Sequence, residues 1–305
     1  MVHCRNRDKI LFFTESGQVY SVHAYHISES SRASAGSKIA SIVGIPKDDE
    51  INAIVCIPHD SVDPDLMLVQ VTRDGMIKKT PLAEYQNINK SGKIAIKLNP
   101  GDILKGVKVA EKDSVVVIAS DFGRCIMFKL DDLRAIGRGS RGVRALNMNK
   151  NNKVVTMDVV KAEYLATEQD NIASDDDEAY SVTSEDDTLV PCILSVSKKA
   201  KIKRTPLKLF RTQARNGVGV VLSKFDKGDS LAGFQIVGTG DLQQEVLIAS
   251  KQGIVNRLSV AKIPIYKGRT AKGVMGLKLK SEDQVKTIAV VALNPEDDLD
   301  GNKSA

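Results

Sequence analysis

Apolar and polar residues follow one pattern that recurs five times along the chain. Each recurrence opens with a short apolar segment of strand length, and a turn follows it. A second segment then alternates apolar and polar residues, which is typical of a strand with one buried face. The apolar segments span residues 10–14, 66–72, 115–120, 192–197 and 246–250, and the alternating segments span residues 19–24, 77–82, 125–130, 202–207 and 254–260.

Glycines mark two positions in each repeat. Hairpin turns need a positive φ, which glycine adopts at little cost. Ala200 replaces the turn glycine of the fourth repeat, so we expect that turn to be strained or of another type. The turn glycines are Gly17, Gly75, Gly123 and Gly253, and the second glycines, 17 to 20 residues further on, are Gly36, Gly92, Gly142, Gly217 and Gly273.

Two more short strands complete each predicted repeat. Four short strands per unit of about 45–50 residues are typical of a propeller blade, which buries its faces only by stacking on other blades. The chain has no Trp, so it lacks the Trp-Asp signature of WD repeats. We therefore predict an all-β, propeller-like fold of five four-stranded blades. The third strands are expected at residues 37–42, 93–98, 143–148, 218–223 and 274–279, and the fourth at 51–57, 103–109, 154–160, 231–237 and 285–291.

Composition excludes several classes of protein. No apolar stretch approaches the ~18 residues of a membrane span, and the first residues lack the hydrophobic region of a secretory signal. The chain is thus expected to act where it is made, or its first residue is not the native start. The four cysteines are isolated, which argues against a zinc site or a disulfide framework. We expect no metal, no cofactor, no small-molecule substrate and no membrane partner.

The net charge of +6 conceals an asymmetry. Residues 163–189 hold ten acids and no Lys or Arg, and the tail 294–305 is also acidic. Without these two segments the remaining chain carries +19, a charge that attracts polyanions. We therefore expect one domain over residues 1–293, with an acidic disordered insertion at 163–189, and a disordered acidic tail. Two interpretations of the insertion stay open: a solubilising linker, or a competitor for the basic surface.

The repeats carry a family resemblance that covers about residues 9–293. The series is similar to the C-terminal β-pinwheel domain of the A subunit of DNA gyrase and of its topoisomerase IV counterpart. Within that family it resembles the plant and organellar branch. The resemblance implies a chloroplast or mitochondrial nucleoid for a plant-type protein and the cytoplasm otherwise. It rests on the stretches FFTESGQVYSV (12–22), SRASAG (31–36), DGMIKKT (74–80), SGKIAIKL (91–98), GSRGVRAL (139–146), KRTPL (203–207) and GRTAKGV (268–274).

The chain departs from that family in two ways. The family has six repeats, and the chain resembles the second to the sixth; the glycine-rich basic box of the first, needed for wrapping DNA in the supercoiling sense, does not occur here. No tyrosine follows an arginine as in the cleavage motif, and there is no Walker-type loop. We therefore expect a domain that by itself neither cuts DNA nor hydrolyses ATP. The resemblance implies two partners, which are the catalytic region of the gyrase A subunit, and the gyrase B subunit.

Basic residues recur around the second glycine of every repeat, and equivalent positions are expected on one rim. Lys and Arg there would bind the phosphates of duplex DNA without reading its sequence, and bend or wrap it. Few aromatic residues are interleaved, which disfavours stacking on single strands. The alternative is a propeller-like scaffold for acidic proteins that has lost the topoisomerase role. The candidate contacts are Arg32, Lys38, Lys90, Lys93, Arg138, Arg141, Arg144, Arg211, Arg215, Lys267, Arg269 and Lys272, with Lys78, Lys79, Lys203, Arg204 and Arg257 of the second strands widening the track.

Overall fold

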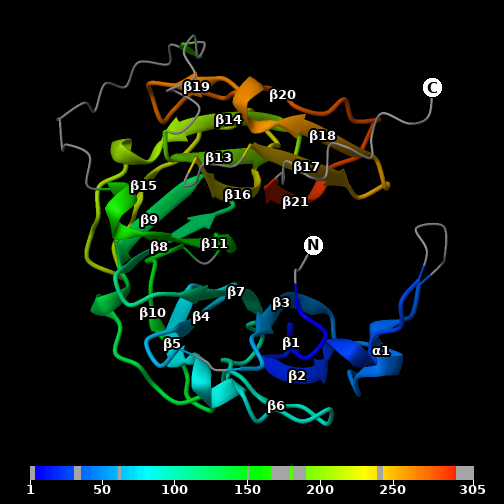
Figure 1. The fold of residues 1–305 in the computed structure, drawn as a ribbon. Helices are drawn as coiled ribbons and strands as arrows, with labels where there is room; N and C mark the ends of the chain where they lie inside the picture. Colours follow the sequence, from blue (N-terminus) through cyan, green and yellow to red (C-terminus); the bar gives the residue numbers. More distant parts are fainter. Residues whose placement is uncertain are drawn as a thin grey trace. The chain divides into compact units, whose positions relative to one another are not determined.

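Short strands dominate the computed structural model of the chain (Figure 1). The structure describes residues 4–30, 36–60, 63–149, 151–165, 179–180, 190–238 and 243–292, with 179–180 as backbone only. The α-helix there is α1 (Ile39–Ile42), a single turn. Short 3-10 turns lie at Ala24–His26, Leu82–Tyr85, Leu130–Asp132, Ala162–Leu165, Leu207–Leu209 and Val260–Lys262.

Each repeat contributes a central hairpin formed by its first two strands. The register within the first hairpin pairs Phe13 with Val19, and the Gly17 N–H donates to the Thr14 carbonyl across the turn at 3.0 Å. Gly17 has φ +80°, whereas Ala200 takes φ +63° in the equivalent turn, as the strain expected there requires. The hairpins are β1 (Lys9–Thr14) with β2 (Gln18–His23), β4 (Met67–Thr72) with β5 (Met76–Pro81), β8 (Ser114–Ser120) with β9 (Arg124–Lys129), β13 (Cys192–Ser197) with β14 (Lys201–Pro206), and β17 (Gln244–Ser250) with β18 (Val255–Ser259).

The fourth strand of every repeat lies on the free side of its first strand. In the first, second, fourth and fifth repeats this pairing is antiparallel with one register shift near the turn, for example between Phe13 and Thr14 in the first sheet. These strands are β3 (Ile51–Ile57), β7 (Leu104–Ala110), β11 (Val154–Lys161), β16 (Leu231–Val237) and β21 (Val285–Ala292).

In the second to fifth repeats the third strand belongs to the preceding blade, which corrects the assignment from sequence. It is only two residues long and pairs with the second strand of the repeat before it, so that Lys93 lies opposite Val19. The order of the first sheet is therefore β3-β1-β2-β6. The exchanged strands are β6 (Lys93–Ile94), β10 (Val143–Arg144), β15 (Val220–Val221) and β20 (Val274–Met275), which pair with β2, β5, β9 and β14.

This exchange leaves the two ends of the series different from the middle. Residues 37–42, expected as a strand, include helix α1 instead, and among the described residues they pair with none of the strands. In the described part of the chain, the fifth sheet has three strands, in the order β18-β17-β21. The all-β fold with five propeller-like blades is confirmed.

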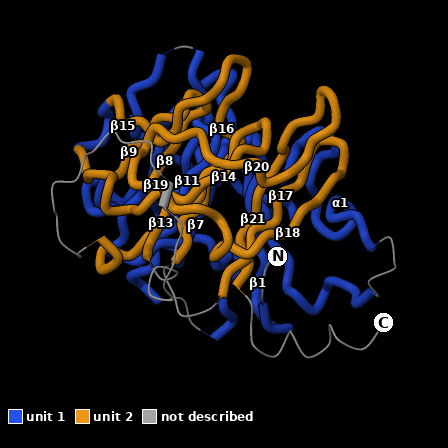
Figure 2. The backbone as a smooth tube through the Cα atoms, turned by 90° about the horizontal axis from the view of Figure 1, so that it is seen from above, with its two compact units in different colours: residues 1–116, 128–159, 214–217 blue, residues 117–127, 160–213, 218–305 orange. Residues whose placement is uncertain are grey.

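The chain divides into two compact units (Figure 2). Unit 1 comprises residues 1–116, 128–159 and 214–217, and unit 2 comprises residues 117–127, 160–213 and 218–305. Each unit has its own apolar core between the faces of its sheets, with Leu11, Phe13 and Leu68 buried in unit 1 and Leu194, Ile202 and Ile248 buried in unit 2. Among the described residues, none of the helices is long and apolar enough to cross a membrane.

Candidate nucleic-acid interface

In the second to fifth repeats, a connector links the second strand to the exchanged strand that follows it. We define four connectors: residues 82–92, 130–142, 207–219 and 260–273. Each starts with a 3-10 turn whose first side chain is buried, so that this end of the connector is anchored in the core. The anchors are Leu82, Leu130, Leu207 and Val260.

Glycine ends each connector because the backbone there lies directly against the preceding blade. A Cβ on Gly142 would lie 2.5 Å from the Ile77 carbonyl oxygen, and one on Gly273 would lie 2.5 Å from that of Ile202. Gly273 also has φ +82°, a value that side chains disfavour. The backbone at the end of a connector can therefore pack against the preceding blade only because glycine has no side chain.

Most of the basic residues predicted around the second glycines are solvent-exposed. Lys93, Arg138 and Arg269 are partly buried, and Arg32 lies outside the described residues. Unit 1 carries Lys38, Lys90, Lys93, Arg138, Arg141, Arg144 and Arg215, and unit 2 carries Arg211, Lys267, Arg269 and Lys272.

Some of these side chains have protein partners. The Lys93 ammonium donates to the Asn87 carbonyl at 3.0 Å, and the Arg215 Nε donates to the Asp132 carbonyl at 3.3 Å. Lys272 lies 2.6 Å from Asp226. Hydrogen bonds from Lys201 and Lys272 lower the pKa of Asp226 to about 2, so this carboxylate stays ionised at neutral pH. A phosphate that binds Lys272 must therefore compete with Asp226.

The basic pairs of the second strands do not extend the exposed surface. The structure buries Lys78, Lys203 and Arg204, each with about 1% of its surface exposed, and leaves Lys79 with 7%. Lys79 forms an ion pair with Asp131 at 3.6 Å. We expected these four residues to widen the exposed basic surface. Their charged groups point into the protein, which argues against direct contact with a phosphate.

The buried cations donate to backbone carbonyls of the next connector. The Lys78 Nζ contacts the carbonyl oxygens of Gly137 at 3.1 Å and Arg138 at 2.5 Å. The Lys203 Nζ donates to the Arg269 carbonyl at 2.6 Å. Two of the predicted phosphate contacts, Arg138 and Arg269, are thus held through their own backbone by a lysine of the preceding blade.

Every exchanged junction has such a contact, which we call a connector latch: a side chain of the second strand that donates to the next connector. In the first blade the Ser21 hydroxyl donates to the Ile88 carbonyl at 2.5 Å. In the third, Arg124 donates from Nε to Val218 at 3.0 Å and from Nη2 to Gly219 at 2.8 Å. The latches are Ser21, Lys78, Arg124, and Lys203 with Arg204.

Sequence reasoning missed the latches, although one signal was present. The strands 78–81 and 203–206 read Lys-Lys-Thr-Pro and Lys-Arg-Thr-Pro at equivalent positions. Thr80 and Thr205 are fully buried. A basic pair that recurs beside a buried threonine indicates a structural role for the cations.

Burial has a measurable effect on the Lys78 ammonium. It lowers the pKa of Lys78 to about 8, because the charged form loses its hydration; nearby Glu84 opposes this and Arg138 adds to it. The two carbonyl acceptors offset part of the cost of burying the charge.

The family model for the DNA gyrase C-terminal domain, beta-propeller, matches residues 8–58, 67–111, 114–161, 193–237 and 244–292. The chain belongs to this family. The five matched segments coincide with the five repeats and make up most of the chain, so the repeat boundaries inferred from hydrophobic pattern and glycine spacing agree with those of the family.

Curated relatives extend over nearly the whole chain. It is 35% identical to the DNA gyrase A subunit of Synechocystis over 97% of its length, and 32% identical to the chloroplastic/mitochondrial gyrase A subunit of Arabidopsis thaliana over 99%. The gyrase A subunit of Staphylococcus aureus is 27% identical over the full chain. The chain spans about a third of the length of these relatives, 31–35%. Relatives thus occur among bacteria and among plant organellar proteins.

Solved structures share the fold of this gyrase C-terminal domain. The C-terminal domain of DNA topoisomerase IV superposes with a TM-score of 0.75 at 19% identity, and covers 94% of this chain and 80% of its own. A DNA gyrase A C-terminal domain superposes with a TM-score of 0.71 at 22% identity, covering 93% and 83%. At these identities the likeness shows the fold.

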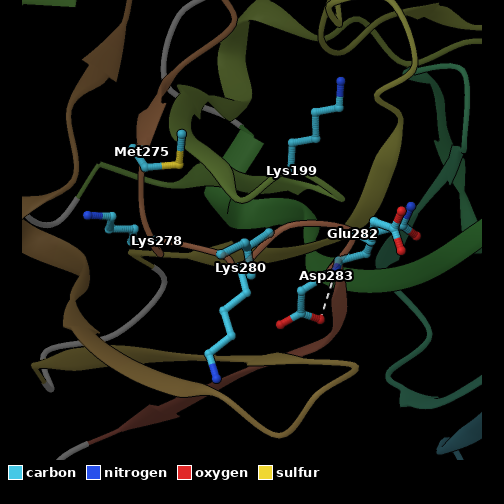
Figure 3. A pocket seen from close by; sticks show the side chains of 8 residues that line it. Lys199, Met275, Lys278, Lys280, Glu282 and Asp283 are labelled. Carbon is cyan, nitrogen blue, oxygen red and sulfur yellow. Dashed lines mark hydrogen bonds between the residues drawn. The ribbon is translucent and has the colours of Figure 1, made fainter.

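A small cavity of about 370 Å³ lies in unit 2 of the domain (Figure 3). Three lysines, Lys199, Lys278 and Lys280, line it together with Glu282 and with Asp283, whose carboxylate accepts from the backbone of Gln284. Among the described residues, no group of three or more His, Cys, Asp or Glu side chains could hold a metal ion. The cavity lining thus carries three positively and two negatively charged side chains.

The expected acidic insertion lies mostly outside the described residues. Within 163–189, residues 163–165 continue a 3-10 turn that starts at Ala162. Ala179–Tyr180 form strand β12, which pairs antiparallel with β19 (Ile265–Tyr266) at the edge of the fourth sheet. The described strand thus places residues 179–180 of the insertion beside Ile265–Tyr266, the residues that precede Lys267. Residues 166–178 and 181–189, and the tail from residue 293, lie outside the described part, and the disorder predicted for them stays a prediction.

Proposed function

We propose that this gyrase-type C-terminal domain binds duplex DNA through its phosphates and bends it, as a non-catalytic part of a type IIA topoisomerase. The observation that carries the proposal is the recurrence of exposed basic residues on the connectors, at equivalent positions of successive repeats. Lys and Arg at such sites neutralise phosphates without reading bases. The match to the gyrase domain family supports the same ligand.

The connector latches strengthen this proposal. A phosphate contact is most effective when the backbone that carries it is already ordered, because less conformational entropy is lost on binding. Lys78 holds the carbonyl of Arg138 and Lys203 holds that of Arg269, so these connectors are ordered before DNA arrives. In this proposal Lys78, Lys79, Lys203 and Arg204 position the connectors and do not touch DNA.

Bending is the finer part of the proposal. Contacts spread over several repeats can all be used only if the duplex follows them. A smooth bend of 40–90° costs about 1–6 kcal/mol, which several phosphate contacts offset at low salt.

We propose two protein partners, the catalytic region of the gyrase A subunit, and the gyrase B subunit. We also propose an organellar nucleoid as the location of a plant-type protein, and the cytoplasm otherwise.

The decisive experiment changes Arg138, Arg141 and Arg144 of one connector to Ala and measures duplex affinity against salt concentration. We expect binding to be nearly independent of sequence, with log affinity falling linearly in log salt. The triple variant should flatten this slope by about 2–3 units, because each lost phosphate contact contributes about 0.9. Arg141 and Arg144 are exposed and Arg138 is only partly buried, so their side chains add little to stability and the variant should fold.

A matched control removes the same charge away from the connectors. Lys227, Lys251 and Lys280 are exposed residues in turns between strands, and changing all three to Ala also lowers the charge by three. This control should leave the slope close to its original value. A slope near zero in the unmodified chain, or equal flattening by both triples, would defeat binding through the connectors.

A further inference from the structure

Two lysines of unit 2 share one carboxylate beside the junction into the fifth blade. Lys201 is the first residue of β14, and Lys272 directly precedes the second glycine of the fifth repeat. Asp226 binds both ammonium groups, Lys201 through Oδ2 and Lys272 through Oδ1, each at 2.6 Å. The positions of its two oxygens show that two oxygens of a single anion fit between these lysines.

All three side chains remain accessible to solvent. The exposed fractions are 28% for the Lys201 side chain, 53% for that of Lys272 and 41% for that of Asp226. The two ammonium groups can therefore meet a ligand at the surface, unlike that of Lys203, which is buried against the Arg269 carbonyl. Lys201 is not among the contacts that the sequence predicts.

Asp226 opens a turn that recurs in all five repeats. In each turn the N–H of the fourth residue donates to the carbonyl of the first, as Asp229 does to Asp226 at 3.0 Å. The Asp229 carboxylate also accepts from the Lys199 N–H at 3.0 Å, which fixes the backbone of the fourth turn. The Asp226 side chain can therefore leave the lysines by rotation about its own bonds, without a change in the turn.

Among these five turns, the fourth alone begins with an acid. The first residues, in chain order, are Pro46, Asn99, Asn149, Asp226 and Lys280. The turn itself does not need a carboxylate, because proline, asparagine or lysine serves in the other repeats. The acid stands where two lysines converge on it, so its role concerns the lysines and not the turn.

A carboxylate between two ammonium groups marks a site that also suits a phosphate. A backbone phosphate presents two unesterified oxygens on one atom, as a carboxylate does, and both anions accept short hydrogen bonds from ammonium groups. We propose that Lys201 and Lys272 bind one backbone phosphate of duplex DNA, and that the Asp226 carboxylate occupies this site in the free domain. This assignment rests on the proposed function and adds Lys201 as a contact and Asp226 as an internal competitor.

The competitor belongs to the same chain, so its effective concentration at the lysines is high. A phosphate displaces it most readily when other contacts, such as Lys267 of the same connector, already hold the duplex. In the complex the Asp226 carboxylate turns toward solvent, which its exposed position permits. Asp226 thus lowers the affinity for duplex DNA without removing the site.

The first test compares duplex affinity at low salt for the unmodified chain and for Asp226→Asn. Asparagine keeps the turn, as Asn99 and Asn149 show, and removes the charge that competes with phosphate. Glu282→Gln is the matched control, because Glu282 is an exposed acid of the same unit and the change removes the same charge. We expect Asp226→Asn to tighten binding about three- to tenfold, since phosphate no longer has to replace two exposed ion pairs, and Glu282→Gln by less than about twofold.

The second test asks whether Lys201 contacts the phosphate or only holds the carboxylate. Lys201→Ala is combined with Asp226→Asn, so that no carboxylate is left for the lysine to hold. This double variant should bind at least about threefold more weakly than Asp226→Asn, and the slope of log affinity against log salt should flatten by about 0.9. Lys199→Ala in the same background removes an exposed charge two residues away and should flatten the slope by less than about half as much.

The outcomes distinguish this site from the proposed function. Failure of both the unmodified chain and Asp226→Asn to bind duplex DNA would overturn both. Equal tightening by Asp226→Asn and Glu282→Gln, or no tightening by either, would overturn the two-lysine site while binding through the connectors stands. The same holds if Lys201→Ala leaves the affinity of Asp226→Asn unchanged, because Lys201 would then only hold the carboxylate. Circular dichroism of each variant checks that the strands are retained.

Discussion

The third and fourth blades hold the following connector with the same side chain in two different environments. Arg204 donates from Nε to the Ile263 carbonyl at 2.8 Å and from Nη2 to the Ala261 carbonyl at 3.2 Å, and it is buried. Arg124 makes the same pair of bonds to Val218 and Gly219, but it is partly exposed. Both guanidinium groups satisfy two connector carbonyls.

Burial decides what each arginine contributes. Near the surface, water can replace a lost donor, so the net value of the bond is small. In the interior no water is at hand, and carbonyls left without a donor cost their full desolvation energy. The comparison indicates that the junction into the fifth blade depends on its buried cation, whereas the junction into the fourth depends mainly on packing and backbone pairing.

The largest expected effect comes from Arg204→Leu. We expect it to lower the free energy of unfolding by about 2–4 kcal/mol, because the Ile263 carbonyl, in a buried bond, and the Ala261 carbonyl, in a partly buried one, lose their donor. Arg124→Leu should cost only about 0.5–1.5 kcal/mol. Chemical denaturation followed by circular dichroism measures both. Met127→Leu, at the position of Arg204 in the third blade, is the control for packing and should cost less than about 1.5 kcal/mol. Equal losses for the two arginines would show that burial is not the cause.

The sequence predicted the hairpins well, because their signals are local. An apolar segment, a turn glycine and an alternating strand occupy about 15 neighbouring residues, and the register within each hairpin follows from the turn. The Ala200 turn illustrates this: the expected strain appears as φ +63°.

Pairing between repeats could not be predicted in the same way. The outer strand is two residues long, and its partner lies some 70 residues earlier, as Lys93 and Val19 show. Periodicity shows that a strand exists and not which blade it joins. The buried state of Lys78 has the same cause, since its acceptors at Gly137 and Arg138 are about 60 residues away. A charged residue in an alternating strand otherwise indicates a solvated face.

A pH series sharpens the comparison at Lys78. The pKa of Lys78 is about 8 in the fold and about 10.5 when unfolded, so between these values the unfolded chain binds more protons. This group's contribution to stability therefore rises with pH through that window. The difference in unfolding free energy between the unmodified chain and Lys78→Met should grow by about 1–3 kcal/mol from pH 7 to pH 10. Arg124→Leu should show no such growth, because arginine does not titrate there. A constant difference would mean that the ammonium is hydrated.

The smallest expected effect separates positioning from contact with DNA. Lys203→Met removes a buried charge, so no phosphate contact is lost and the slope of log affinity against log salt should change by less than half a unit. Affinity itself should fall two- to fivefold, about 0.5–1 kcal/mol, because the Arg269 carbonyl loses its donor and the connector loosens.

Lys267→Ala, an exposed residue of the same connector, should instead flatten the slope by about 0.9. The two variants remove one positive charge each and differ in where it lies, so the slope reports direct contact alone. If Lys203→Met flattened the slope as much as Lys267→Ala, the Lys203 ammonium would have to leave the Arg269 carbonyl and bind a phosphate in the complex. Lys203 would then contact DNA directly instead of only positioning the connector.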